Sequence, residues 1–349
     1  MLLDALRPGV LTAMSGGVDS AVAAALLLDS GCRCTAVTLK LCGGADIDDA
    51  RRAAEELGIP HFTLDFTEAF RDEVIRYFIE SYERGETPNP CIACNREIKF
   101  RRLLSQAGEF GCGALATGHY ARIEKSGSRY LLRKAFDLGK DQSYVLYTLD
   151  QETLASARFP LGGLAKSEVR EIALARGLEN ADKKESQDIC FVPDGDYGAF
   201  MEQYTGKRYP EGDILDPDGQ VIGRHHGIVR YTLGQRRGLG VAVNRPVYVS
   251  AKDAARNTVT LGPEEALYAK TLAADRINLI ACENLEKPMR VTVKTRYLQQ
   301  EKPAWAFQTG PDEVRVEFDE AQRAITPGQS AVFYDGDVVV GGGIIREAV

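Results

Sequence analysis

The alternation of apolar runs and helical periods near the start of this chain is the feature that most constrains its fold. Short runs typical of buried strands alternate with segments of helical period, the strands at 10–14, 34–40 and 59–66 and the helices at 21–31 and 46–57. Strands that alternate with helices in this order pair in parallel, because each helix carries the chain back across the sheet. We therefore expect an α/β fold built on a doubly wound parallel sheet.

A second architecture is expected beyond Tyr204. Turns rich in Gly, Pro and Asp appear at 209–223, and helical periods disappear. Period-two alternation follows at 291–297, 314–318 and 330–343, which is typical of short antiparallel strands in a small barrel or sandwich.

Composition limits the classes of function. The net charge of −7 and the pI of about 5.4 mean that any nucleic-acid surface must be local. Six basic residues between 224 and 237 form one such strip, although a solvated turn would look the same. The longest apolar run, 21–28, is too short to cross a bilayer, so no membrane partner is expected. Eight cysteines without an export signal predict reduced thiols and a cytoplasmic protein.

A glycine turn follows the first expected strand. Residues 15–20, SGGVDS, open the first helix, where glycines let backbone N–H groups approach a ligand and the helix end favours negative charge. The turn lacks the Gly-Lys-Ser/Thr ending of a Walker A loop, so an ordinary NTPase is not indicated. We expect a phosphate site; the alternative is a helix cap without a ligand.

Two cysteines, Cys91 and Cys94, lie three positions apart just before a predicted helix, where the helix dipole can lower a thiol pKa. Cys190 is distant in sequence but could reach the same site. Zinc would require a second pair of ligands, which is missing. The remaining thiols are expected to be core residues, namely Cys32, Cys34, Cys42, Cys112 and Cys282.

Taken together, the motifs make the chain resemble the tRNA-specific 2-thiouridylase family, MnmA, within the PP-loop ATP pyrophosphatases. Nearly the whole chain is covered by seven segments in order: SGGVDS at 15–20, NPCIACNREIKF at 89–100, ATGHYAR at 116–122, KDQSYVLYTL at 140–149, DICF at 188–191, YTLGQRRGLG at 231–240 and KTRY at 294–297. The resemblance implies a PP-loop, HUP-like catalytic domain over 1–203, a small tRNA-contacting central domain over 204–268 and a C-terminal antiparallel β-barrel over 269–349.

The resemblance also implies roles for individual residues. ATP would be held by Ala13, Met14, Ser15, Gly16, Gly17, Val18, Asp19, Ser20, Leu39 and Gly118. Asn89, Pro90 and Cys91 would face the target base, Cys190 would carry a persulfide, and Cys94 would be the nucleophile that helps to release its sulfur. Contacts with tRNA would come from His119, Lys140, Asp141, Gln142, Arg296, Tyr297 and Gln329.

The implied reaction is chemically consistent with these residues. Adenylation by ATP turns the poor leaving group at C2 of uridine into a phosphate ester, which a sulfur nucleophile can displace. A magnesium ion would offset the charge of the pyrophosphate, and Asp19 is a candidate for arranging this ion, although a capping role explains it equally well. The sulfur donor, a protein persulfide or sulfide, is a further expected partner.

Cys91 departs from the family pattern, because many members carry Asp at this position as acid or base. A thiol is a poorer base than a carboxylate at neutral pH, which puts that role in doubt. Three readings stay open: Cys91 only packs, a persulfide relay operates without it, or Cys91, Cys94 and Cys190 bind a [4Fe-4S] cluster with one iron free for sulfide.

Two other functions fit the glycine loop. Another PP-loop ligase or amidating enzyme would use it, but would leave the segment 87–94 unexplained. A non-catalytic ATP- or RNA-binding module would use the loop without turnover.

Overall fold

A five-stranded parallel sheet forms the first unit of the computed structural model, which describes residues 9–42, 47–178, 189–241 and 244–349. Its strand order is β3-β2-β1-β4-β7, with β1 (Gly9–Ala13), β2 (Cys34–Lys40), β3 (His61–Asp65), β4 (Cys112–Ala116) and β7 (Ala157–Arg158). The register places Val10 opposite Cys34 and Thr12 opposite Ala116. The predicted parallel sheet is therefore confirmed, and all its strands have their carboxyl ends at one edge.

Helices cover both faces of this sheet. The helices α1 (Val18–Asp29), α2 (Ile47–Glu56) and α8 (Lys166–Ala175) enclose a core of small side chains on one face. On the other face, Leu11 of β1 packs with aromatic residues of the long helices described below, so the sheet is doubly wound as expected. None of the helices in the described part of the chain is long and apolar enough to cross a membrane.

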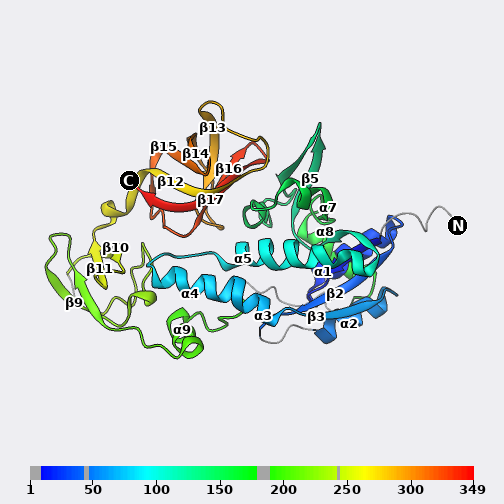
Figure 1. The fold of residues 1–349 in the computed structure, drawn as a ribbon, viewed down its shortest axis with the longest axis horizontal. Coiled ribbons are helices and arrows are strands. Elements are labelled where there is room, and N and C mark those ends of the chain that lie inside the picture. The colour runs from blue at the N-terminus through cyan, green and yellow to red at the C-terminus, as the bar shows by residue number, and fades with distance from the viewer. Residues whose placement is uncertain (1–8, 43–46, 179–188, 242–243) are drawn as a thin grey trace.

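Two long composite helices lie side by side across the middle of the molecule (Figure 1). The first runs through α3 (Thr67–Phe70), η2 (Arg71–Ile75) and α4 (Arg76–Glu83), and the second through α5 (Pro90–Ala93), η3 (Cys94–Leu103), α6 (Leu104–Gln106) and η4 (Ala107–Phe110). The second helix starts at Pro90, where the side chain of Asn89 accepts a hydrogen bond from the Cys91 N–H at 3.1 Å. The Cys-x-x-Cys pair thus lies in the first turns of this helix, and its predicted position on the preceding loop is wrong.

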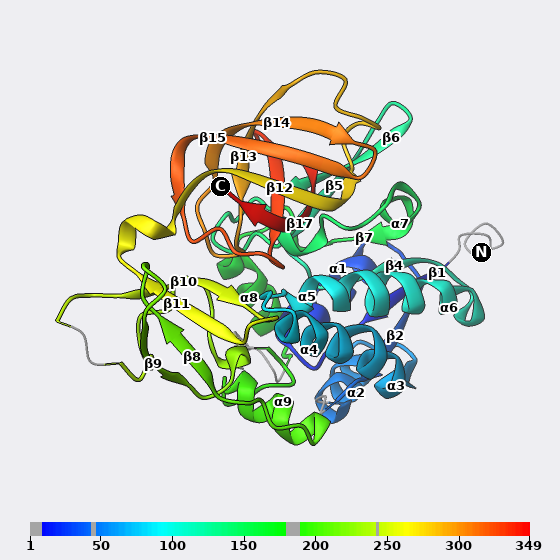
Figure 2. The ribbon, with the colours of Figure 1, turned by 60° about the vertical axis from the view of Figure 1, so that its left-hand side comes forward.

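The two remaining units are all-β or nearly so (Figure 2). A four-stranded central sheet has the order β10-β11-β8-β9, and a six-stranded barrel closes because β12 pairs with both β15 and β17. Closure decides between the barrel and the sandwich that the alternation allowed. The bounds are β8 (Gly212–Leu215), β9 (Val221–His225), β10 (Tyr248–Asp253), β11 (Thr258–Gly262), β12 (Tyr268–Leu279), β13 (Met289–Lys294), β14 (Lys302–Gly310), β15 (Glu313–Arg323), β16 (Ser330–Asp335) and β17 (Val338–Ala348).

A hairpin of the first unit, β5 (Ala121–Ser126) and β6 (Arg129–Lys134), extends the barrel sheet by pairing Arg133 with Val338. The short helix α7 (Gln151–Ser156) supports this contact, because the Gln151 amide donates to the carbonyl of Ile280 at 3.1 Å. The helix α9 (Tyr197–Thr205) leads into the central sheet. The domain limits at residues 203 and 268 remain predictions.

Candidate active site

The glycine turn between β1 and α1 has the shape of an anion-binding loop. Gly16 has a positive φ of 77°, which a residue with a Cβ adopts at a cost, and Gly17 is the N-cap of α1. The Ser20 hydroxyl accepts from the Ser15 N–H at 3.2 Å and donates to the Gly17 carbonyl at 2.9 Å. Ser15 is exposed, so the loop is open to a ligand at the carboxyl edge of the sheet.

Gly118 joins this loop from the end of β4. A Cβ built at Gly118 would lie 2.8 Å from the backbone nitrogen of Ser20 and 2.9 Å from the carbonyl carbon of Asp19. Only glycine therefore fits here without displacing the first turn of α1. Leu39, at the end of β2, is half-buried. The structure thus brings the predicted ATP residues of β1, β2 and β4 to one edge of the sheet.

Asp19 is already paired within the protein. The Lys166 ammonium donates to both carboxylate oxygens, at 2.6 and 2.8 Å, and the Tyr120 hydroxyl donates to Oδ1 at 2.8 Å. The Lys166 side chain is 8% exposed, so this ion pair is nearly enclosed. A magnesium ion bound at Asp19 would have to displace an ammonium group. Sequence reasoning missed Lys166, because α8 is 147 positions away and carries no distinctive motif.

The three predicted thiols come together beside the second long helix. Cys94 is buried, whereas Cys91 and Cys190 are exposed. Phe191 fixes the position of Cys190, because its ring contacts Phe70 and Phe78 edge-on with centroid distances of 5.8 and 5.2 Å. The requirement that Cys94 and Cys190 lie near one another is met, since each influences the electrostatics of this small cluster.

Burial, followed by the charges of neighbouring groups, sets the protonation of these thiols. Desolvation raises the pKa of Cys94 to about 11, and it also raises the pKa values of Cys91 and Cys190. The Lys99 ammonium opposes this effect at all three thiols by favouring the thiolate. The expectation that the helix dipole lowers the pKa of this pair is therefore wrong, because desolvation outweighs it.

Cys42 is a fourth thiol in the same region. It lies two residues beyond the end of β2, is half-buried and packs against the cluster that contains Cys94 and Phe191. Burial, together with the Cys190 and Cys94 thiolates, raises its pKa to about 12. The interpretation of Cys42 as an ordinary core residue misses this proximity. Its position just past a strand that ends at the ligand edge was the signal available in the sequence.

The donor set does not fit an iron–sulfur cluster. Across 9–42, 47–178, 189–241 and 244–349, no three His, Cys, Asp or Glu side chains are grouped so that they could hold a metal ion. The three thiols lie near one another without forming such a group. The geometry gives the predicted [4Fe-4S] site no support, and we derive no step through a cluster.

Two residues predicted to touch tRNA have internal roles after β4. His119 is 8% exposed, its Nδ1 lies 2.7 Å from the Thr117 hydroxyl, and desolvation lowers its pKa well below 6.5. Asp141 is buried and accepts from the Ser143 hydroxyl at 2.7 Å. Neither group presents a free polar atom to solvent in this conformation.

The neighbours of Asp141 are more accessible. Lys140 and Gln142 are half-buried, and the Gln142 side chain accepts from the Tyr120 N–H at 2.9 Å, which holds the tyrosine that donates to Asp19. This segment therefore supports the phosphate loop.

The barrel contributes a second group of predicted tRNA residues. The Gln329 amide donates to the carbonyl of Thr87 at 2.7 Å, which joins the barrel to the segment that precedes Asn89. Arg296 donates to the Thr326 hydroxyl at 2.7 Å, and burial lowers its pKa. Tyr297 is half-buried. These residues lie on the thiol side of the barrel, and their side chains organise the contact between units.

The basic strip is largely neutralised by carboxylates. Arg224, His226 and Arg230 each pair with an acidic side chain. Arg236 and Arg237 are exposed. These two arginines are the part of the strip best placed to meet an RNA backbone.

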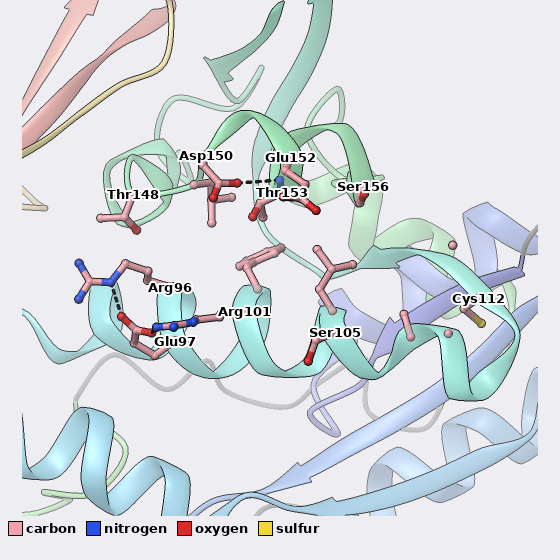
Figure 3. Close-up of a pocket in the computed structure, with 16 residues that line it drawn as sticks. Arg96, Glu97, Arg101, Ser105, Cys112, Thr148, Asp150, Glu152, Thr153 and Ser156 are labelled. Carbon is pink, nitrogen blue, oxygen red and sulfur yellow. Dashed lines mark hydrogen bonds and ion pairs between the residues drawn. The ribbon is translucent and has the colours of Figure 1, made fainter. Parts of the chain in front are cut away.

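A separate cavity of about 620 Å³ lies between η3 and α7 (Figure 3). Glu97 receives hydrogen bonds from Arg96 at 2.7 Å and Arg101 at 2.8 Å, so the basic groups of the cavity are paired. Neither the glycine loop nor the predicted thiols line it.

The fold and the site together define an α/β phosphate-binding protein with a cluster of thiols at the ligand edge. Comparison with known families agrees with this class. Residues 8–194 match the tRNA methyl transferase HUP domain, 198–263 the tRNA methyl transferase PRC-barrel domain and 269–345 the aminomethyltransferase beta-barrel domain.

Curated relatives specify the family. The chain is 46% identical to tRNA-specific 2-thiouridylase MnmA of Clostridioides difficile, with 97% of this chain and 98% of the relative covered. It is 48% identical to the MnmA of Treponema denticola, with 97% of each covered. The solved NMN synthetase of Francisella tularensis covers 60% of this chain and 81% of its own, with TM-score 0.35 and 22% identity, and we draw no conclusion from it. The chain belongs to the tRNA-specific 2-thiouridylase family.

Proposed function

We propose that this chain is a tRNA-uridine 2-sulfurtransferase. It would adenylate the 2-oxygen of the wobble uridine with ATP and replace that oxygen with sulfur carried by cysteine, releasing AMP and pyrophosphate. The observation that carries the proposal is the shared position of the glycine loop and the thiol cluster at the carboxyl edge of one parallel sheet. An activated base held there lies within reach of both.

In the first step, the loop at 13–20, with Leu39 and Gly118, would hold ATP. The uridine oxygen attacks the α-phosphate, and pyrophosphate leaves. Loop N–H groups and the amino end of α1 stabilise the negative charge that develops on the leaving group. Magnesium, when bound to the phosphates, supplies further charge neutralisation. The Lys166 ammonium at Asp19 is the protein's own cation at this end of the loop.

In the second step, sulfur would come from a persulfide on Cys190. Its terminal sulfur attacks C2 and displaces AMP, which leaves the base joined to Cys190 through a disulfide. The Cys94 thiolate then attacks the sulfur of Cys190, so that the thiouridine departs and a Cys94–Cys190 disulfide forms. Lys99 favours the thiolate that this step requires. Asn89, Pro90 and Cys91 would line the target base.

The partners follow from this reaction. A persulfide protein or sulfide would load Cys190, and tRNA would bind over the thiol side, with contacts proposed for His119, Lys140, Asp141, Gln142, Arg296, Tyr297 and Gln329. The internal bonds of His119 and Asp141 mean that these two would act by holding the site unless the segment rearranges on binding. We also propose the cytoplasm as the location, as the cysteine content predicts.

The test is nucleoside analysis of tRNA after incubation with ATP, a sulfur source and the protein. Wild type should form 2-thiouridine and release pyrophosphate, and Cys190→Ala should form none. Cys282→Ala, a half-buried thiol in the barrel unit, is the matched control and should retain activity.

Each alternative function predicts a different result. A ligase or amidating enzyme would release pyrophosphate without thiolating tRNA, and a binding module would release none. Unchanged product from Cys190→Ala would mean that the sulfur carrier is misassigned.

A further inference from the structure

The thiol cluster contains one more cysteine than the proposed sulfur transfer uses. Cys42 reaches the cluster from the sheet side, beyond the end of β2, whereas Cys91 and Cys94 enter from the second long helix. Cys42 and Ile189, the neighbour of Cys190, both pack against the core that includes Cys94. Three separate elements therefore bring Cys42, Cys94 and Cys190 together.

The proposed reaction leaves the enzyme with a chemical problem. Each transfer ends with a Cys94–Cys190 disulfide, and Cys190 cannot accept another sulfur until that bond is opened. A third nearby thiol can open it by thiol–disulfide exchange, which needs no oxidant or reductant because one disulfide replaces another.

We propose that Cys42 is the resolving thiol of this site, a role that rests on the sulfur relay proposed above. The Cys42 sulfur attacks the sulfur of Cys94, a Cys42–Cys94 bond forms, and the Cys94–Cys190 bond breaks. The electron pair leaves with Cys190 as a thiolate, and the proton of Cys42 passes to solvent. A dithiol reductant later supplies two electrons and two protons that return Cys42 and Cys94 to thiols.

Exposure gives this exchange its direction. Cys190 is exposed and Cys94 is buried, so water solvates the departing thiolate best at Cys190. The new disulfide joins the two thiols that are more enclosed, and the freed Cys190 is the one that an external sulfur donor can reach.

Cys91 is the competing resolving thiol, since it lies one helical turn from Cys94. Under the proposed function it faces the target base and would be covered while tRNA is bound. Cys42 approaches from the sheet side and can react before the product leaves. The experiment must therefore distinguish a Cys42–Cys94 bond from a Cys91–Cys94 bond.

Disulfide mapping by mass spectrometry, after blocking free thiols with N-ethylmaleimide, decides this point. Wild type should contain Cys42–Cys94 after turnover with tRNA, ATP and a sulfur source without reductant. Cys42→Ser should accumulate Cys94–Cys190 instead, and its rate after the first turnover should fall about tenfold, with dithiothreitol restoring it. Cys34→Ser, a buried thiol at the other end of the same strand, should behave like wild type.

A second experiment does not depend on thiolation. Mild oxidation of the reduced protein with diamide should also give Cys42–Cys94 in wild type. Cys42 recovered as a free thiol in both experiments, or Cys91–Cys94 in its place, would overturn the assignment. If wild type forms no thiouridine, the sulfur relay fails, and the diamide result still shows whether Cys42 can exchange with Cys94.

Discussion

Replacing Gly118 with alanine should separate the end of β4 from the phosphate loop. The added Cβ would lie 2.8 Å from the Ser20 nitrogen and 2.9 Å from the Asp19 carbonyl carbon, whereas ordinary contacts begin at 3.4 Å. The atoms must therefore move apart by about 0.6 Å. Both neighbours are backbone atoms of the first turn of α1, so no side-chain rotation can relieve the overlap.

This displacement should affect catalysis more than stability. Overpacking of this kind costs on the order of 1–3 kcal/mol, whereas a shift approaching 1 Å in a reacting group can lower a rate by about 10²-fold. We expect Gly118→Ala to reduce tRNA-dependent pyrophosphate release roughly 10- to 100-fold and to weaken ATP binding measured by calorimetry.

Gly163→Ala is the control, because no heavy atom lies within 4 Å of a Cβ at that position. It should retain the ATP affinity and rate of wild type. If Gly118→Ala binds ATP and releases pyrophosphate as wild type does, the close approach of β4 to the loop has no part in positioning the nucleotide.

Three further predictions follow from buried charge. Lys166→Met should lower the free energy of unfolding by about 2 kcal/mol in urea titrations, because it leaves the partly exposed Asp19 carboxylate without its cation; an effect equally large in an Asp19→Asn background would contradict the pairing. Burial lowers the pKa of His119 in the folded protein, so the unfolded chain binds more protons below pH 6.5 and stability should fall as the pH drops from 6.5 toward 5; a pH profile that His119→Asn leaves unchanged would refute this. Lys99→Gln should raise the pKa of Cys94 further and slow its iodoacetamide alkylation at pH 8, with Lys99→Arg near wild type; equal rates in Lys99→Gln and wild type would count against the charge effect.

The sequence alone determined the features that depend on local chemistry. The strand at 34–40 coincides with β2, because an apolar, β-branched run between turns specifies a buried strand without distant information. The glycine turn at 15–20 likewise indicates a phosphate loop, since Gly16 requires a positive φ and the serines supply short-range hydrogen bonds. The family motifs placed three of the reactive residues in the correct region.

Only the tertiary structure decided which distant groups meet. Barrel closure depends on β12 reaching β17, and alternation in each strand is the same in a barrel and a sandwich. The Lys166 partner of Asp19 and the approach of Cys42 to Cys94 likewise join segments far apart in the chain. Burial reversed the expected pKa of the thiol pair, because desolvation is set by atoms packed around a group and not by its neighbours in sequence.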